Sequence, residues 1–111
     1  MSAPALSPTT DYDTLKELLR AEERVAVYLS TETCAPCRAI RPFVKELFAD
    51  DGWRLIEVDT PSAPTIAGQL LIFAHPTLLL FGDGREYKRF SRIFRRDEVA
   101  EAKEQLERLM A

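Results

Sequence analysis

The sequence predicts an α/β domain with a mixed central β-sheet and helices on both of its faces. Mostly apolar runs at 25–29 and 77–81, typical of buried strands, alternate with segments in which apolar residues recur at helical spacing. The last two of the predicted strands are separated only by a Gly-Asp-Gly turn. The expected order is α, β, α, β, α, β, β, α. Strands separated by a helix can pair in parallel, whereas strands joined by a tight turn pair antiparallel, so the sheet should be mixed.

The amino-terminal half is expected to contain two helices and two strands. A short first helix is predicted from Thr14, which forms a T-x-x-E capping box with Glu17, to about Glu23. The run over 25–29 lacks alternating polar residues and should form a strand buried on both faces. The next two elements are a helix after Cys34, which Asp51-Gly52 should end, and a strand over 54–58.

The carboxyl-terminal half is expected to add a helix, a hairpin and a last helix. A short helix is predicted over about 61–71, with Thr60 as its cap. Strands over 77–81 and 86–90 should be joined by a turn at 82–84. Asp97 and Glu98 favour the start of the last helix by complementing its dipole. The apolar stripe predicted for that helix consists of Val99, Ala102, Leu106, Leu109 and Met110.

The composition is that of one globular domain. The 111 residues are 46% hydrophobic and 30% charged, a balance that excludes intrinsic disorder. Residues 1–10 should form a flexible amino-terminal arm and residues 11–111 the domain. A net charge of -3 argues against nucleic acid as a partner, and the apolar runs are too short to cross a membrane. The first eight residues lack the features of a secretory signal, so a cytoplasmic location is expected.

The motif Cys34-Ala35-Pro36-Cys37 is the strongest candidate for chemistry. It lies between a buried strand and the predicted start of a helix, where backbone amides and the helix dipole stabilise an anion. A thiolate at Cys34 should therefore be stabilised, while Cys37, one turn further along, should be less exposed. In this arrangement Cys34 attacks a substrate disulfide and Cys37 resolves the mixed disulfide. Pro36 removes an amide donor and stiffens the loop.

Two other interpretations of the cysteine pair stay open. A structural disulfide is disfavoured, because a chain of this length can bury a core without one and the cytoplasm keeps thiols reduced. A metal site normally has three or four protein ligands, and this chain offers at most Cys34, Cys37 and its single histidine, His75. Redox exchange is therefore the favoured interpretation, and no metal ion is expected.

Several motifs together resemble the thioredoxin family over roughly residues 12–110. The motif Cys34–Cys37 is similar to the Cys-Gly-Pro-Cys of the family, and Pro42 matches the proline that bends its active-site helix. Val58-Asp59 matches the end of the following strand, and residues 76–81 with Gly84 resemble its Pro-Thr-Leu-Leu-Leu-Phe segment and hairpin glycine.

The resemblance implies a thioredoxin-like three-layer α/β/α sandwich with a mixed central β-sheet. It also implies that Pro76 is a cis-proline that faces the two cysteines, and that the neighbouring backbone pairs with a substrate strand. No bound organic cofactor is implied, because the redox group is the Cys34–Cys37 disulfide itself. Electrons are expected from a thioredoxin reductase or a similar donor.

The chain departs from the family pattern around the expected site. Thr33 replaces a tryptophan and can cap the helix. Tyr28 replaces the buried aspartate that is thought to move protons to and from the buried cysteine, and Leu55 replaces the lysine paired with it. His75 replaces an aliphatic residue or threonine before the cis-proline. A glycine of the substrate groove corresponds to Arg92 or Ser91.

Three features admit both an ordinary and a functional interpretation. His75 either lines the groove or stabilises the Cys34 thiolate as an imidazolium. Tyr28 is expected in the core with its hydroxyl hydrogen-bonded, and the case for its handling the Cys37 proton is weaker. A basic run is either a solvated face or a patch that selects acidic partner segments. The run consists of Arg85, Lys88, Arg89, Arg92, Arg95 and Arg96.

The sequence thus predicts a thiol–disulfide oxidoreductase that reduces disulfides of other proteins and contributes to cell redox homeostasis. Cys34 and Cys37 are the catalytic candidates, and Tyr28 and His75 are the candidates for proton handling. The residues expected to shape the site and the substrate groove are Thr33, Ala35, Pro36, His75 and Pro76. The rival interpretation is a thioredoxin-fold binding or adaptor module that holds an extended partner in the groove around Pro76 without turnover.

Overall fold

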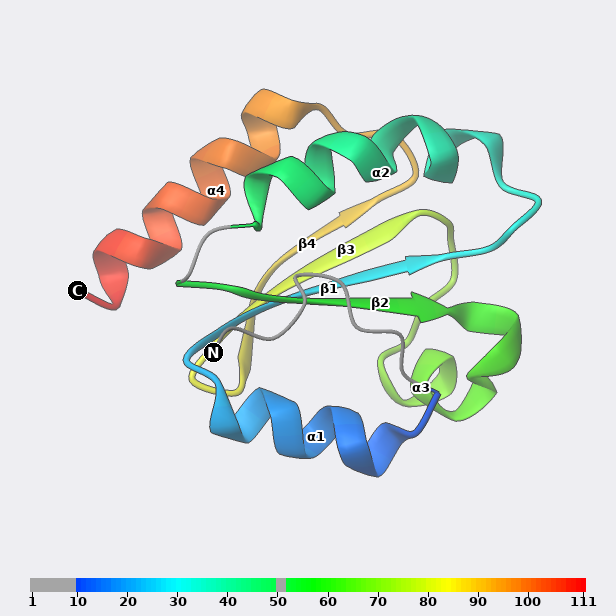
Figure 1. Cartoon of the computed structure of the whole chain (residues 1–111), viewed down its shortest axis with the longest axis horizontal. Helices are drawn as coiled ribbons and strands as arrows, with labels where there is room; N and C mark the ends of the chain where they lie inside the picture. The colour runs from blue at the N-terminus through cyan, green and yellow to red at the C-terminus, as the bar shows by residue number, and fades with distance from the viewer. Residues whose placement is uncertain (1–9, 50–51) are drawn as a thin grey trace.

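A four-stranded mixed sheet in the order β2-β1-β3-β4 forms the middle layer of the molecule (Figure 1). The structure is a computed structural model, and it describes residues 10–49 and 52–111. Its strands are β1 (Arg24–Ser30), β2 (Arg54–Asp59), β3 (Thr77–Gly82) and β4 (Arg85–Ser91). β1 pairs in parallel with β2 and antiparallel with β3, and β3 and β4 form an antiparallel hairpin. The predicted mixed sheet is therefore confirmed.

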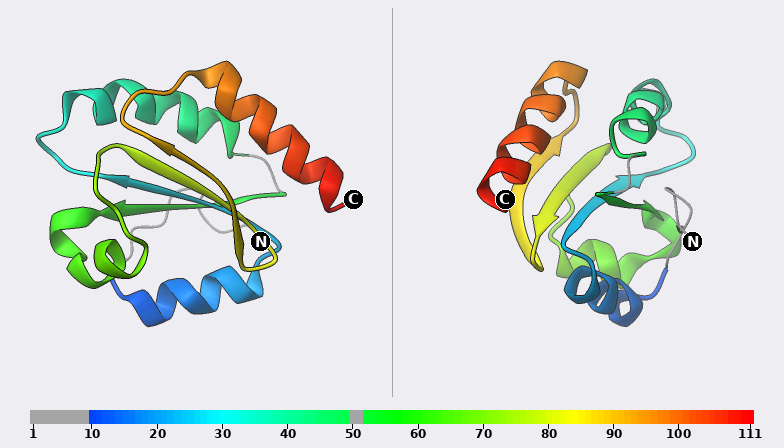
Figure 2. Two further views of the ribbon diagram at one scale, coloured as in Figure 1. Left: turned by 180° about the vertical axis from the view of Figure 1, so that it is seen from behind. Right: turned by 60° about the vertical axis from the view of Figure 1, so that its left-hand side comes forward.

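Helices cover both faces of this sheet (Figure 2). On one face lie α2 (Ala35–Leu47) and α4 (Arg96–Leu109), and on the other lie α1 (Tyr12–Ala21) and α3 (Pro64–Gln69). A short 3-10 helix, η1 (Thr60–Ser62), precedes α3. The three-layer architecture and the order of the eight expected elements are confirmed.

Two apolar cores lie on the two faces of the sheet, because successive strand residues point in opposite directions. Leu78 and Leu80 of β3 belong to the core beneath α2 and α4, whereas Leu79 and Phe81 belong to the core beneath α1 and α3. The five central residues of β1, at 25–29, are all fully buried, as their apolar run predicted. Packing of these cores holds β1 and β3 in place, and the predicted site residues lie near the end of β1 and the beginning of β3.

The hairpin between β3 and β4 turns at Asp83 and Gly84. Both residues have positive φ, 50° and 81°, as a two-residue type I′ turn requires. Glycine adopts this conformation at little cost, and aspartate tolerates it better than most side chains. The predicted turn is confirmed.

The capping residue predicted for α1 is wrong. The helix begins at Tyr12, and its N-cap is Asp11, so Thr14 lies inside the first turn. The Asp11 carboxylate accepts hydrogen bonds from the backbone N–H of Asp13 at 3.1 Å and the hydroxyl of Thr14 at 2.8 Å. Aspartate caps a helix better than threonine, and its carboxylate suits the positive end of the dipole. The helix also ends at Ala21, before the predicted Glu23.

The helix predicted over 61–71 is divided in two. Pro64 has no N–H with which to continue a helix from η1, but it suits the first turn of α3. Thr60 lies inside η1, whose N-cap is Asp59. α2 ends at Leu47, with Phe48 as its C-cap, which is earlier than the stop predicted at 51–52. Residue 51 and residues 1–9 of the predicted arm lie outside the described residues.

The apolar stripe of α4 is narrower than predicted. Val99, Ala102 and Leu106 are buried, whereas Leu109 is 71% exposed. Met110 lies four residues after Leu106, and the two side chains lie over Gly82 at the end of β3. Because Met110 occupies this inward position, Leu109 points to solvent.

Candidate active site

The segments that carry the predicted site residues meet at one edge of the sheet, where β1 ends and α2 and β3 begin (Figure 1). β1 ends at Ser30, and the chain then leads through 31–34 into α2. Thr77, the first residue of β3, pairs with Leu29 near the end of β1, so Pro76 lies at the same edge. The His75–Pro76 peptide bond is cis. The cysteine motif and the proline segment, about 40 residues apart in the chain, thus meet at this edge.

Cys34 and Cys37 are joined by a disulfide bond, with their Cα atoms 5.2 Å apart. Cys34 is the N-cap of α2, and its Sγ accepts a hydrogen bond from the backbone N–H of Cys37 at 3.2 Å. The capping role predicted for Thr33 is therefore wrong: Thr33 is exposed, and the cysteine sulfur takes the cap position. Pro36 lies in the first turn of the helix, where its missing N–H costs no helical hydrogen bond.

The two sulfurs differ in exposure. The Cys34 residue is half-buried, whereas Cys37 is only 3% exposed. The first turn of α2 directs backbone N–H groups toward Cys34 and so favours negative charge on its sulfur when the pair is reduced. An accessible sulfur that is stabilised as an anion, next to a buried one, is the arrangement that dithiol exchange needs.

Tyr28 ties the cysteine helix to the sheet. It is fully buried in β1, and its hydroxyl donates a 2.6 Å hydrogen bond to the carbonyl oxygen of Cys37. Burial, together with the nearby charge of Glu57, raises the pKa of Tyr28 to about 12, against a smaller opposing effect of Arg41. The hydroxyl therefore stays protonated at neutral pH and acts as a donor.

We expect Tyr28→Phe to reduce the loss of stability at high pH. The unfolded chain loses the phenolic proton near pH 10 and the folded chain near pH 12, so the free energy of unfolding falls as the pH rises through this window. The slope should be smaller in Tyr28→Phe than in the wild type when urea unfolding is followed at a series of pH values. Tyr87→Phe, which removes the hydroxyl of an exposed tyrosine, is the matched control. Equal slopes in all three proteins would contradict the assignment.

His75 is partly buried, and its ring is hydrogen-bonded to the neighbouring segment η1. Its Nε2 lies 2.8 Å from the Oγ1 of Thr60, and the Thr60 hydroxyl donates to the carbonyl of Ser30 at 3.0 Å. Since the Thr60 proton is directed at Ser30, Nε2 is the donor to Thr60. This chain of hydrogen bonds holds the segment before Pro76 against the end of β1. Stabilisation of the Cys34 thiolate by His75 stays a prediction.

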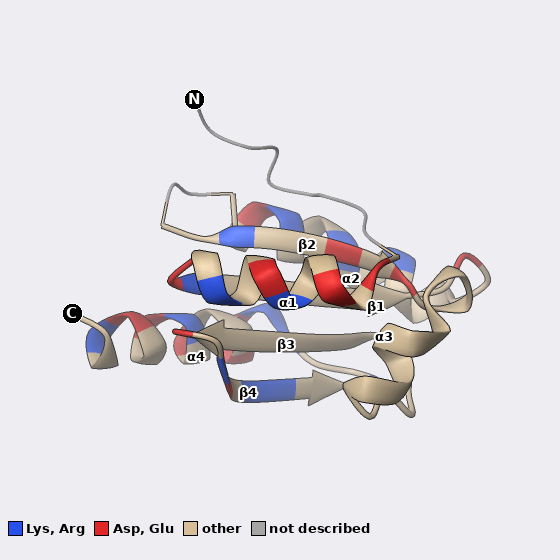
Figure 3. Cartoon of the chain, turned by 90° about the horizontal axis from the view of Figure 1, so that it is seen from below, with Lys and Arg blue, Asp and Glu red and all other residues tan. Residues whose placement is uncertain are grey.

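Three residues of the basic run, Arg89, Arg95 and Arg96, form ion pairs with acidic side chains. Basic and acidic residues are mixed along α4, whereas β4 carries a basic stretch (Figure 3). Arg89 binds the carboxylate of Glu86 at 2.8 Å, and it also donates to two backbone carbonyls at the end of α3. Two further ion pairs join Arg95 to Asp97 and Arg96 to Glu46. These contacts favour the interpretation of the run as a solvated face.

Arg92 differs from the rest of the basic run. It is exposed and has a φ of 73°, a left-handed conformation that favours glycine. Its backbone N–H donates to the carbonyl of Pro76 at 2.8 Å. Of the two positions considered for the groove glycine, Arg92 is thus the one with glycine-like backbone geometry.

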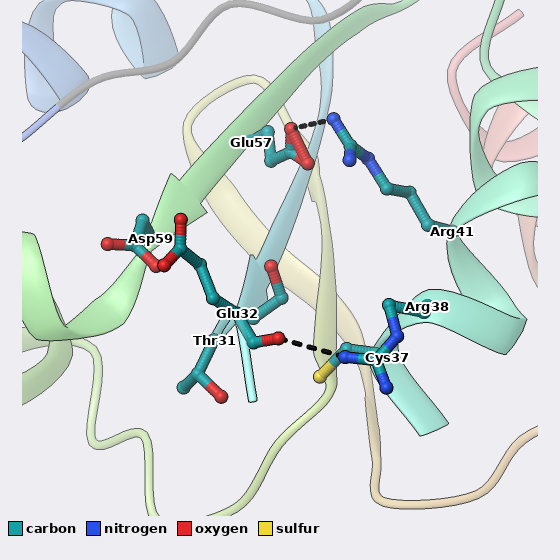
Figure 4. A pocket seen from close by; sticks show the side chains of 8 residues that line it. Thr31, Glu32, Cys37, Arg38, Arg41, Glu57 and Asp59 are labelled. Atoms are coloured by element: carbon teal, nitrogen blue, oxygen red, sulfur yellow. Dashed lines mark hydrogen bonds and ion pairs between the residues drawn. The ribbon is translucent and has the colours of Figure 1, made fainter. Parts of the chain in front are cut away.

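A cavity of about 510 Å³ opens beside the buried cysteine (Figure 4). It is lined by Ser30, Thr31, Glu32, Cys37, Arg38, Arg41, Glu57 and Asp59. Arg41 forms a 2.6 Å ion pair with Glu57, and Arg38 donates to the backbone carbonyl of Glu32 at 2.9 Å. This group of charges was not predicted from the sequence. The signal was present in Glu57, a charged residue inside an otherwise apolar strand run.

Comparison with known proteins identifies the family. The family model described as Thioredoxin matches residues 6–105. The chain belongs to the thioredoxin family. Thioredoxin 1 of Synechococcus elongatus is 33% identical over 78 residues, which cover 68% of this chain and 73% of that protein. Thioredoxin C-2 of Corynebacterium nephridii is 36% identical over 86 residues, which cover 76% and 79%.

Solved thioredoxins share the fold. A mutant thioredoxin from Halobacterium salinarum NRC-1 matches with a TM-score of 0.86 and 19% identity, over 96% of this chain and 95% of that one. Oxidised mitochondrial thioredoxin 3 from Saccharomyces cerevisiae matches with a TM-score of 0.81 and 19% identity, over 91% and 95%. The predicted thioredoxin fold is confirmed.

Membership of the thioredoxin family, with the Cys34–Cys37 pair at disulfide distance, makes the chain a thiol–disulfide oxidoreductase. The adaptor interpretation is not favoured by these findings. In the part of the chain that the structure describes, no three His, Cys, Asp or Glu side chains are grouped so as to hold a metal ion. Nor does any helix within residues 10–49 and 52–111 combine the length and apolar character needed to span a bilayer.

Proposed function

We propose that this thioredoxin family member works as a reductase of protein disulfides, with Cys34 as the nucleophile and Cys37 as the resolving thiol. The main support for this proposal is that Cys34 is the N-cap of α2, while Cys37, one turn further along the helix, is nearly inaccessible. The Cys34 thiolate attacks one sulfur of a substrate disulfide, and the other substrate sulfur leaves as a thiolate. Cys37 then attacks the Sγ of Cys34, which releases the remaining substrate thiolate and leaves the protein oxidised.

The proposed substrate groove runs along the sheet edge at Pro76. An extended substrate segment pairs there with the backbone that precedes β3, in the manner of an added strand. Thr33, Ala35 and Pro36 form the exposed surface on the cysteine side of this edge. Phe73, two residues before His75, and Ile93, next to Arg92, expose 87% and 83% of their surface and would supply apolar contact for a substrate chain.

The proposed electron donor is a thioredoxin reductase or a similar dithiol donor, and the protein itself needs no bound organic cofactor. The proposed compartment is the cytoplasm, where a reducing glutathione pool favours the reductive direction. The relatives of the chain include thioredoxin Y1 of Arabidopsis thaliana, described as chloroplastic. The donor proposal is tested by asking whether a thioredoxin reductase with NADPH reduces the oxidised protein.

The direction of catalysis is tested by the reduction potential of the Cys34–Cys37 couple. A reductase should have a potential of about -220 mV or lower, measured by equilibration with glutathione or a dithiol buffer. It should also accelerate the reduction of insulin disulfides by dithiothreitol. A potential near about -120 mV would instead indicate an oxidant. No acceleration of insulin reduction would favour the adaptor interpretation.

A further inference from the structure

The resolving step, in which Cys37 attacks the Sγ of Cys34, requires a group that accepts the proton of the Cys37 thiol. Before Cys37 can attack Cys34, its thiol must become a thiolate, yet Cys37 is only 3% exposed. Tyr28 does not serve as the acceptor, because its pKa is raised to about 12 and its hydroxyl proton is donated to the Cys37 carbonyl. Leu55, at the second position where the family has a charged residue, carries no ionisable group.

Three carboxylates line the cavity beside Cys37 and are candidates to accept its proton: those of Glu32, Glu57 and Asp59 (Figure 4). Among them, the carboxylate of Glu57 in β2 is ion-paired with a residue of α2, the helix that carries Cys37. Its side chain is 14% exposed and forms the ion pair with Arg41, which lies four residues after Cys37 and thus on the same side of α2. Its Cα is opposite Tyr28 in the parallel register of β1 and β2, and its charge acts on the Tyr28 hydroxyl.

The other two carboxylates differ from Glu57 in their surroundings. The Asp59 carboxylate accepts a 2.7 Å hydrogen bond from the hydroxyl of Ser62. Glu32 is an exposed residue of the loop before α2. The remaining charged groups that line the cavity are the cations Arg38 and Arg41, which cannot accept a proton.

We propose that Glu57 accepts, through this cavity, the proton that Cys37 loses when it resolves the mixed disulfide. The proposal rests on the roles given above to Cys34 and Cys37. In the step, the S–H bond of Cys37 breaks and its proton passes to the Glu57 carboxylate. The Cys37–Cys34 disulfide bond forms, and the bond from Cys34 to the substrate breaks with its electron pair on the substrate sulfur. The two cysteines are oxidised, the substrate is reduced, and Glu57 then returns the proton to solvent.

The test follows one turnover of the reduced full-length protein with a symmetric aromatic disulfide. Attack by Cys34 releases a first coloured thiolate, and resolution by Cys37 releases a second, so the two steps give separate phases. Glu57→Gln should slow the second phase at least about tenfold and change the first phase less than twofold. Its second phase should rise steadily with pH, because the proton is then lost to bulk solvent alone, whereas the wild-type rate levels off. Glu57→Asp should partly restore the wild-type profile.

The controls separate this proposal from the function on which it depends. Glu46→Gln removes a carboxylate that is also paired with an arginine but lies outside the cavity, and both phases should keep wild-type rates. A wild-type second phase in Glu57→Gln would overturn the proposal, as would a slowed second phase in Asp59→Asn alone. Absence of the first phase in the wild type would instead refute the roles proposed for the cysteines.

Discussion

Replacing Cys34 with serine should abolish disulfide reduction, whereas replacing Cys37 should stop the reaction after its first step. The N-cap geometry favours an anion at Cys34, but a serine hydroxyl there stays protonated and does not attack a disulfide. We expect insulin reduction to fall by about 10³-fold or more in either variant, since the two sulfurs act as one unit. Cys37→Ser should accumulate a covalent adduct with a disulfide-containing peptide, detectable by mass spectrometry, and Cys34→Ser should form none.

The double variant provides the control for this assignment. Cys34→Ser/Cys37→Ser should be no less active than Cys34→Ser, because the second removal takes away a group that has nothing left to resolve. Both single variants also lose the disulfide, so the folded fraction of each should be checked by urea unfolding before rates are compared. Adduct formation in Cys34→Ser with none in Cys37→Ser would reverse the two roles.

The sheet could be predicted because its information is local. The run over 25–29 is apolar at every position, and the structure buries all five residues. The Gly-Asp-Gly turn likewise encodes the hairpin, since residues with positive φ are needed there. Helix ends were less predictable, because Asp11 and Thr14 are both good caps and compete within three residues.

The surroundings of the cysteines could be predicted only in part. That the hydroxyl of Tyr28 would find a partner follows from its burial, but the choice of the Cys37 carbonyl depends on how α2 crosses β1. The ion pair between Arg41 and Glu57 joins residues that are 16 apart, in a helix and a strand, and nothing local links them. The cavity beside Cys37 is built from β1, the following loop, α2 and β2, so it exists only in the folded chain.

Leu106 and Leu109 both belong to the apolar stripe predicted for α4, but only Leu106 is buried. We therefore expect a large loss of stability when Leu106 is truncated and a small one when Leu109 is truncated. Leu106 is 5% exposed and lies over the end of β3, so Leu106→Ala should lower the free energy of unfolding by about 2–4 kcal/mol. The loss comes from the removed apolar contact and from the cavity left between α4 and the sheet. Urea unfolding of the oxidised protein should show a lower midpoint at an unchanged m-value.

Leu109→Ala is the matched control, because it makes the same chemical change three residues later in the same helix. Leu109 is 71% exposed, so its truncation removes little contact and alanine is an equally good helix former. We expect a change within about 0.5 kcal/mol. The pair of variants therefore measures the orientation of the last turn of α4 directly. Equal losses at the two positions would show that Leu109 also packs inward and that the stripe has the full width its sequence suggests.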